Sequence, residues 1–165
     1  MLRINKQKTG FTLVELIIYF GIFSFLLLIL TSVFTSSLSS QLESESLSSV
    51  EQDGRFILLR LARDIQSASS ITVPANPGSN SSDLQLTIDG QNYIYSLSGD
   101  NLILTNNNGV NNLNNFNTIV SDLAFSRIGN PNGKNTIKIS FITTTKTNLN
   151  GVNEFKEFET TIGTR

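Results

Sequence analysis

An uncharged run of 19 residues, Leu16 to Phe34, limits what this chain can fold into more than any other feature. As a helix the run would be roughly 28 Å long, which is close to the hydrocarbon thickness of a bilayer. Its polar side chains are the hydroxyls of Ser, Thr and Tyr, and such groups can bond back to the helix backbone. The run therefore predicts a helix that spans a membrane once.

Positive charge gathers on one side of this run. Arg3, Lys6 and Lys8 precede Gly10 without an acidic residue among them, whereas acidic residues outnumber basic ones in the rest of the chain. By the positive-inside rule the N-terminus should stay in the cytoplasm, so that the bulk of the chain lies outside it. The run is too long for the apolar region of a secretory signal peptide, and no Ala-x-Ala site follows it.

Composition excludes several classes of function. The chain has no Cys and no His, which removes disulfides, thiolate nucleophiles, imidazole bases and the commonest zinc ligands. Its formal net charge is −1, which gives no general attraction for nucleic acid. The sequence therefore predicts a protein that is not an enzyme, holds no cofactor or metal, and does not bind nucleic acid.

A second helical pattern follows the apolar run. Apolar residues recur at steps of three and four, which is the spacing of one helix face. We expect one helix from about Thr12 to about Ser69, with its first half in the membrane and its second half packed on a sheet. The predicted stripe consists of Leu47, Val50, Ile57, Leu58, Leu61, Ile65 and Ala68, with Gly54 in the gap.

Two features refine this helix. Gly54 costs about 1 kcal/mol relative to Ala in mid-helix, which favours close approach of another element at this point. Glu51 and Arg55 stand four residues apart, as do Arg60 and Asp64. Because pairs of opposite charge at this spacing support a helix from its surface, we expect both pairs to be exposed.

Beyond the helix the period changes from 3.6 to 2, which is typical of half-buried strands. Leu84, Leu86 and Ile88 alternate with polar residues, and Asp89-Gly90 is a strong hairpin signal. The expected strands are residues 84–88, 93–97, 102–104, 119–128, 137–147 and 155–164. A long helix followed by an antiparallel sheet predicts an α+β fold.

Polar segments connect these strands. Residues 74–82 (PANPGSNSS) are expected to form a flexible loop, in which Asn80 fits a glycosylation acceptor. Residues 106–117 (NNNGVNNLNNFN) are expected to be a solvated connector, although a role in binding a surface or a sugar stays open. Residues 130–133 are expected to form a turn, and Tyr93 and Tyr95 to serve strand packing rather than a ligand.

The stretch KTGFTLVEL, Lys8 to Leu16, resembles the N-terminal signature of type IV pilins and type II secretion pseudopilins. After a basic leader it combines a small residue, an aromatic residue, a Glu four residues later and the apolar run. The resemblance implies that a membrane-embedded prepilin peptidase cuts between Gly10 and Phe11, and that the new amine of Phe11 is N-methylated. The α+β fold with one long N-terminal helix is also pilin-like.

The resemblance further implies that the mature subunit leaves the lipid of the inner membrane and enters a filament at the cell surface. Its partners would be the prepilin peptidase, other major and minor pilins and the inner-membrane assembly platform. The implied parts are a removed leader (1–10), a transmembrane and filament-core helix (11–34), its amphipathic continuation (35–70) and an antiparallel sheet domain (71–165).

A finer resemblance covers later segments. EQDGRF at 51–56 and LARDI at 61–65 resemble the helix of the PilW-like minor pilins and the J-type pseudopilins, and YSLSGDNL at 95–102 and FETTI at 158–162 are similar to that group. The first helix lacks the proline, and the chain lacks the cysteine pair, that many major pilins carry. The resemblance therefore implies a minor subunit that starts assembly or caps the tip.

Glu15 lies at the start of the apolar helix, where a carboxylate costs several kcal/mol unless it is paired. On the pilin interpretation, the amine that cleavage creates at Phe11 of a neighbouring subunit pairs with Glu15 and sets the axial register. The alternative is a capping box over Thr12 to Glu15, in which Glu15 satisfies backbone donors at the helix start. The two interpretations are compatible.

A different class of function fits part of the same pattern. An uncleaved single-pass membrane protein that displays a β-rich binding domain would also have a basic flank and a long apolar run. It would leave KTGFTLVEL without a role. The N-terminus of the native protein distinguishes the two hypotheses.

Overall fold

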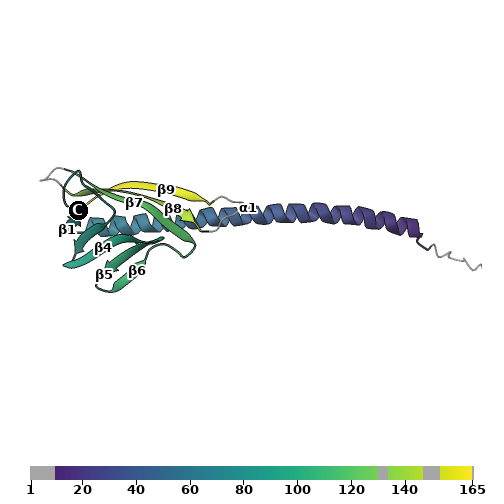
Figure 1. Cartoon of the computed structure of the whole chain (residues 1–165), viewed down its shortest axis with the longest axis horizontal. Helices are drawn as coiled ribbons and strands as arrows, with labels where there is room; N and C mark the ends of the chain where they lie inside the picture. Colours follow the sequence, from purple (N-terminus) through teal and green to yellow (C-terminus); the bar gives the residue numbers. More distant parts are fainter. Residues whose placement is uncertain (1–9, 130–133, 147–152, 165) are drawn as a thin grey trace, which may run out of the picture. The chain divides into compact units, whose positions relative to one another are not determined.

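The structure, a computed structural model, describes residues 10–129, 134–146 and 153–164. Within these ranges one long helix precedes a series of strands (Figure 1). The elements are α1 (Leu13–Ser67), β1 (Ser70–Val73), β2 (Asn80–Ser81), β3 (Leu84–Ile88), β4 (Gln91–Ser98), β5 (Asn101–Asn106), β6 (Gly109–Asn112), β7 (Thr118–Ile128), β8 (Thr136–Thr145) and β9 (Phe155–Gly163). The α+β class with one long N-terminal helix is confirmed.

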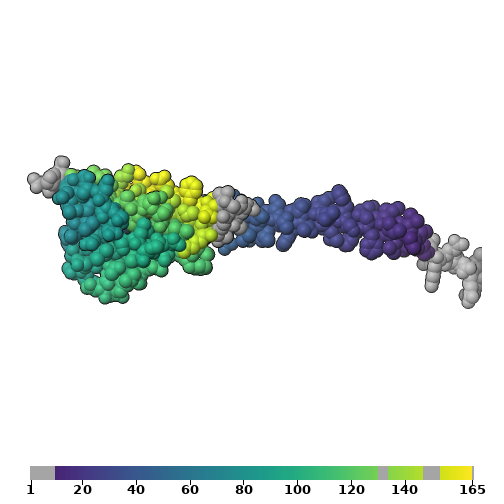
Figure 2. Space-filling model, viewed as in Figure 1, coloured from purple at the N-terminus to yellow at the C-terminus, as the bar shows by residue number. Residues whose placement is uncertain are grey.

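The described chain divides into two compact units between Gln41 and Leu42, and α1 contributes to both. In the first unit no side chain of the helix is buried, and Leu28 is 70% exposed. Figure 2 shows this segment in purple and blue. Among the described residues, α1 is long and apolar enough to cross a membrane.

The second unit contains two antiparallel sheets rather than the single one expected. One sheet has the order β1-β3-β4-β5-β6 and the other β2-β7-β8-β9. The predicted hairpin is present, because Ile88 pairs with Gln91 across Asp89 and Gly90. Both turn residues have positive φ, 49° and 75°, which is the backbone that an Asp-Gly hairpin turn adopts.

The core of this unit joins the helix to both sheets. Ile57, Leu61 and Ile65 of α1 are fully buried, and one cluster unites them with side chains of both sheets. The sheet residues of the cluster include Leu84, Leu86, Tyr95, Leu102, Leu104, Val120, Phe125, Ile137, Ile139, Phe141 and Phe158. The amphipathic second half of the helix is therefore packed as its pattern predicts.

The predicted stripe is wrong at its first residue. Leu47 is 45% exposed, whereas the neighbouring Ser46 is buried. Seven residues make nearly two turns of a helix, so Leu47 points in almost the same direction as Gly54. The prediction fails here because Leu47 is not part of the core cluster. Leu58 is half-buried and packs at the edge of the core.

Gly54 lies where another element approaches, as predicted. A Cβ atom placed there would lie 2.1 to 2.7 Å from ring atoms of Phe158 in β9. The Phe158 ring in turn stacks on Phe141 of β8, with centroids 5.4 Å apart. A side chain at this helix position would therefore displace an aromatic ring from the core.

The two predicted charge pairs have different surroundings. Glu51 pairs with Arg55 at 2.7 Å on the surface, as expected. Asp64 is buried, against expectation, because the Tyr95 hydroxyl of β4 donates a hydrogen bond to its Oδ2, as does Arg60 Nε at 2.9 Å. Burial and this bond to Asp64 raise the pKa of the Tyr95 phenol, so that it stays a neutral donor.

Residues 74–82 and 106–117 are more ordered than expected. The first segment contains β2, which pairs with β7, and Arg127 Nη1 donates to the carbonyls of Pro74 and Ala75. The second contains β6, which pairs with β5. Asn114 is buried there and donates to the Thr118 carbonyl at 2.9 Å. Both segments are therefore part of the packed unit, because strand pairing and buried hydrogen bonds satisfy their backbone.

Candidate functional site

The start of α1 is built on a side-chain cap. Thr12 precedes the first helical residue, and its Oγ1 accepts a hydrogen bond from the backbone N–H of Glu15 at 3.3 Å. The Thr12 carbonyl accepts the backbone N–H of Leu16 at 3.2 Å. This is the geometry of an N-cap residue and fixes where the helix begins.

Only one half of the predicted capping box is observed at Thr12 and Glu15. The hydrogen bond that the structure shows to the Glu15 carboxylate comes from the Tyr19 hydroxyl, one helical turn further on, at 3.1 Å from Oε1. A capping box would direct this carboxylate back to the Thr12 backbone. The Glu15 side chain is half-buried and points along α1 instead.

Phe11 lies on the same face as Glu15 and Tyr19. The Phe11 and Tyr19 rings meet edge to face, with centroids 6.2 Å apart and an interplanar angle of 73°. Glu15 and Tyr19 are four residues apart in α1, which places their side chains on one helix face, and the ring contact brings Phe11, which precedes the helix, to this face. Tyr19 was missed in the sequence as a member of this group, although its four-residue spacing from Glu15 was the available signal.

The predicted cleavage point is accessible. Gly10 and Phe11 are both exposed, and a Cβ atom placed on Gly10 would have no heavy atom within 4 Å. A protease can therefore approach this backbone without displacing another part of the described chain. The basic residues Arg3, Lys6 and Lys8 lie outside the described residues.

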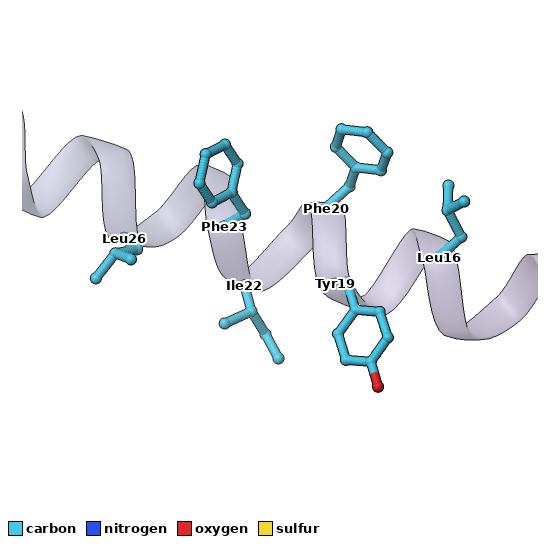
Figure 3. Close-up of a pocket in the computed structure, with 6 residues that line it drawn as sticks. All are labelled: Leu16, Tyr19, Phe20, Ile22, Phe23 and Leu26. Carbon is cyan, nitrogen blue, oxygen red and sulfur yellow. The ribbon is translucent and has the colours of Figure 1, made fainter. Parts of the chain in front are cut away.

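A shallow apolar hollow follows on the surface of α1. It is lined by Leu16, Tyr19, Phe20, Ile22, Phe23 and Leu26. In Figure 3 Phe20 and Phe23 point to one side of the helix and Tyr19 and Ile22 to the other. These side chains do not converge on an enclosed space, so the hollow is surface relief on one helix.

Candidates for other kinds of site do not come together in the described chain. No group of three or more His, Cys, Asp or Glu among the described residues could hold a metal ion. The Tyr95 ring is fully buried and the Tyr93 ring packs against the core, so both serve strand packing. Asn80 is exposed in β2, and its glycosylation stays a prediction.

The N-terminal geometry coincides with a recognised sequence motif. Residues 5–31 match the family model described as the prokaryotic N-terminal methylation motif. The matched range contains Gly10, Phe11, Thr12, Glu15 and Tyr19 and ends inside the apolar half of α1. Neither the curated proteins nor the solved structures give a match to the chain.

Proposed function

We propose that this chain is a type IV pilin or pseudopilin, which its methylation motif supports, and more narrowly a non-enzymatic minor subunit of a pilus or secretion-type filament. The observation that carries the proposal is the motif at residues 5–31, which leads into a helix without a partner in its own unit. Its PilW-like segments, in the second half of α1 and in the strands, support a role in starting assembly or capping the tip.

The first step in this function is processing. A prepilin peptidase would hydrolyse the peptide bond between Gly10 and Phe11, remove leader residues 1–10 and leave a free amine on Phe11, which is then methylated. Exposure of both residues supports this step. The absence of a side chain at Gly10 lets an enzyme close around the backbone.

The second step is a change of surroundings for residues 11–34. Before assembly, lipid would cover this part of α1, with the basic leader holding the N-terminus in the cytoplasm. After assembly, helices of other pilins would cover it, and the continuation (35–70) and the sheet domain (71–165) would lie outside the membrane. The inner-membrane platform would transfer the subunit between the two. Exposure of every residue from 11 to 34 except the half-buried Glu15 supports such an exchange.

The third step is pairing of Glu15 with the amine of Phe11 on a neighbouring subunit. A carboxylate in apolar surroundings costs several kcal/mol unless a charge or hydrogen-bond donors compensate it. The observed cap uses the Thr12 hydroxyl and the Glu15 backbone N–H, so the Glu15 carboxylate is not needed for it. This leaves the carboxylate free to set the axial register between subunits.

The N-terminus of the native protein tests the proposal directly. Mass spectrometry of the protein from its native host should show a chain that starts at Phe11 with a methylated amine. Replacing Gly10 with Val should block processing, because the new side chain obstructs the peptidase. An intact N-terminus in a host that assembles filaments would favour the uncleaved single-pass protein with a β-rich binding domain.

Glu15→Ala separates assembly from capping. Processing and membrane insertion should continue, because Gly10 and Phe11 are unchanged and the helix becomes more apolar. Incorporation into sheared filaments should be lost, because the amine of Phe11 would be buried without a partner. Wild-type incorporation of Glu15→Ala would contradict the pairing. The role of Glu15 would then be limited to the capped start of the helix.

A further inference from the structure

We infer that Tyr19 is a positioning residue for Glu15: its hydroxyl holds one carboxylate oxygen on the Phe11 face of α1 and leaves the other oxygen for a cationic partner. This inference rests on the proposed pairing of Glu15 with the amine of a neighbouring subunit. It adds a role for a residue whose ordinary interpretation is an apolar side chain in a membrane helix.

The geometry ties Tyr19 to both other members of the site. Its hydroxyl donates to Oε1 of Glu15 at 3.1 Å, and its ring meets the Phe11 ring edge to face at 6.2 Å between centroids. The Phe11 ring and the Glu15 carboxylate are therefore held by two parts of one rigid side chain. A tyrosine has few rotatable bonds, so it can do this with a small loss of conformational entropy.

The chemistry explains why a phenol is suited to this place. A carboxylate accepts several hydrogen bonds, and a bond from a hydroxyl to an ionised oxygen is stronger than one between neutral groups. The Tyr19 bond partly compensates the Glu15 charge while lipid surrounds the helix. Because it occupies Oε1 and no described residue donates to Oε2, the second oxygen is open toward an incoming amine.

A neutral hydrogen-bond donor beside Glu15 leaves its charge available for a second partner, whereas a cation does not. A Lys or Arg at this position would form an ion pair with Glu15 and compete with the amine of the neighbouring subunit. The Tyr19 hydroxyl supplies orientation without cancelling the charge, so the Coulomb attraction for the amine is retained. Tyr19 would therefore increase incorporation into the filament without being part of the ion pair.

The functional experiment compares full-length variants in the native host. Tyr19→Phe keeps the ring against Phe11 and removes the hydroxyl, and Thr31→Val removes a hydroxyl that bonds to the Leu27 carbonyl on the same helix. Processing and membrane levels should match wild type in both variants. Incorporation into sheared filaments should fall about tenfold for Tyr19→Phe, which corresponds to one hydrogen bond to a charged group, and stay unchanged for Thr31→Val.

A spectroscopic experiment tests the contact itself. The purified full chain, labelled with ¹³C at the tyrosine Cζ atoms, is placed in detergent micelles, and its resonances are assigned by Tyr→Phe variants. Glu15→Ala should move the Tyr19 resonance, because the hydroxyl loses its acceptor, and Thr31→Val should not. A Tyr19 resonance that is the same in wild type and Glu15→Ala would overturn the contact.

The outcomes separate this inference from the function on which it rests. If Glu15→Ala abolishes incorporation and Tyr19→Phe does not reduce it, Tyr19 has no positioning role and the Glu15 pairing stands. If Tyr19→Leu reduces incorporation and Tyr19→Phe does not, the ring acts alone and the inference about the hydroxyl is wrong. If Glu15→Ala assembles like wild type, the pairing fails and the role of Tyr19 fails with it.

Discussion

The polar side chains in the two halves of α1 find their hydrogen-bond partners in different places. In the first half the hydroxyls bond within the helix, as Thr31 Oγ1 does to the Leu27 carbonyl at 2.8 Å and Ser39 Oγ to the Thr35 carbonyl at 3.0 Å. The second half has local bonds as well, such as that between Arg55 and Glu51, but it adds bonds that reach far along the chain. The Asp53 carboxylate accepts from the Thr118 hydroxyl, and the Asp64 carboxylate from the Tyr95 hydroxyl.

This difference determines what each half can do. The first half makes its polar contacts locally, so it can exchange lipid for protein without breaking a contact to another element. The second half is held by its own strands through a buried cluster and cannot leave them without unfolding. One continuous helix therefore combines a segment suited to changing its surroundings with a segment that fixes a folded unit.

The largest expected effect concerns the buried stripe. Leu61→Asp should unfold the unit of residues 42–165, because an unpaired carboxylate in the core at a fully buried position costs several kcal/mol, a large part of a small unit's stability. Leu59→Asp is the matched control, since Leu59 is 72% exposed on the same helix. Thermal unfolding of a fragment of residues 42–165 measures both, and a cooperative melt of Leu61→Asp near that of wild type would show that the helix face is misplaced.

The two glycines inside α1 sharpen the comparison. Gly54→Ala should destabilise the second unit by about 2 to 3 kcal/mol, because the new methyl group overlaps the Phe158 ring. Gly21→Ala should be neutral or favourable for the first half, since nothing lies within 4 Å of its Cβ position and Ala is the better helix former.

Denaturant unfolding of the 42–165 fragment measures the effect of Gly54→Ala, and helix content of the full chain in micelles measures that of Gly21→Ala. Adding Phe158→Ala to Gly54→Ala should recover part of the loss, because the double variant removes the ring that the methyl group meets. Simple addition of the two single effects would contradict the steric explanation.

A smaller effect is expected at the buried hydrogen bond. Tyr95→Phe should lower the unfolding free energy by about 1.5 kcal/mol, because Asp64 loses a donor to its charged oxygen and keeps Arg60. Tyr93→Phe, on the same strand but only half-buried, is the control. Equal effects of the two substitutions in urea unfolding would indicate that the Asp64 contact does not contribute.

The smallest effect concerns pH. Hydrogen bonds from Lys156 and Arg55 lower the pKa of Glu51 from 4.5 to about 2. The ionised Glu51 carboxylate stabilises the folded state. Its contribution to the free energy of unfolding is fully present above pH 4.5 and is lost as the pH falls toward 2. The unfolding free energy of the 42–165 fragment should decline as the pH is lowered across this range. The decline should be smaller in Glu51→Gln and unchanged in Glu157→Gln. An unchanged decline in Glu51→Gln would exclude this source.

Periodicity in the sequence predicted the elements well. The helix was expected at about 12–69 and lies at Leu13–Ser67, and the last hairpin was expected at 137–147 and 155–164 and contains β8 (Thr136–Thr145) and β9 (Phe155–Gly163). These elements repeat an apolar spacing that only one secondary structure can use. Gly54 was informative because glycine is unfavourable in the middle of a helix, and its presence there indicated that another element approaches closely.

Sequence could not supply the contacts between elements. The division into two sheets and the burial of Asp64 depend on partners far along the chain, such as Tyr95, which local spacing does not reveal. At the candidate site the motif pointed to Gly10, Phe11 and Glu15, and their roles stay predictions. The contact between Tyr19 and Glu15 was visible only once side-chain directions were known, because a four-residue spacing also fits plain membrane packing.

The closure of the second unit by β9 has a consequence for how the protein is made. Val50 and Glu51 of the helix meet Thr143 and Lys156, which lie 93 and 105 residues later. Contacts of such long sequence separation form slowly, and they cannot form before β8 and β9 have been synthesised. Until then the apolar stripe through Ile57 and Leu61 lacks the strands that bury it in the folded unit and is open to aggregation.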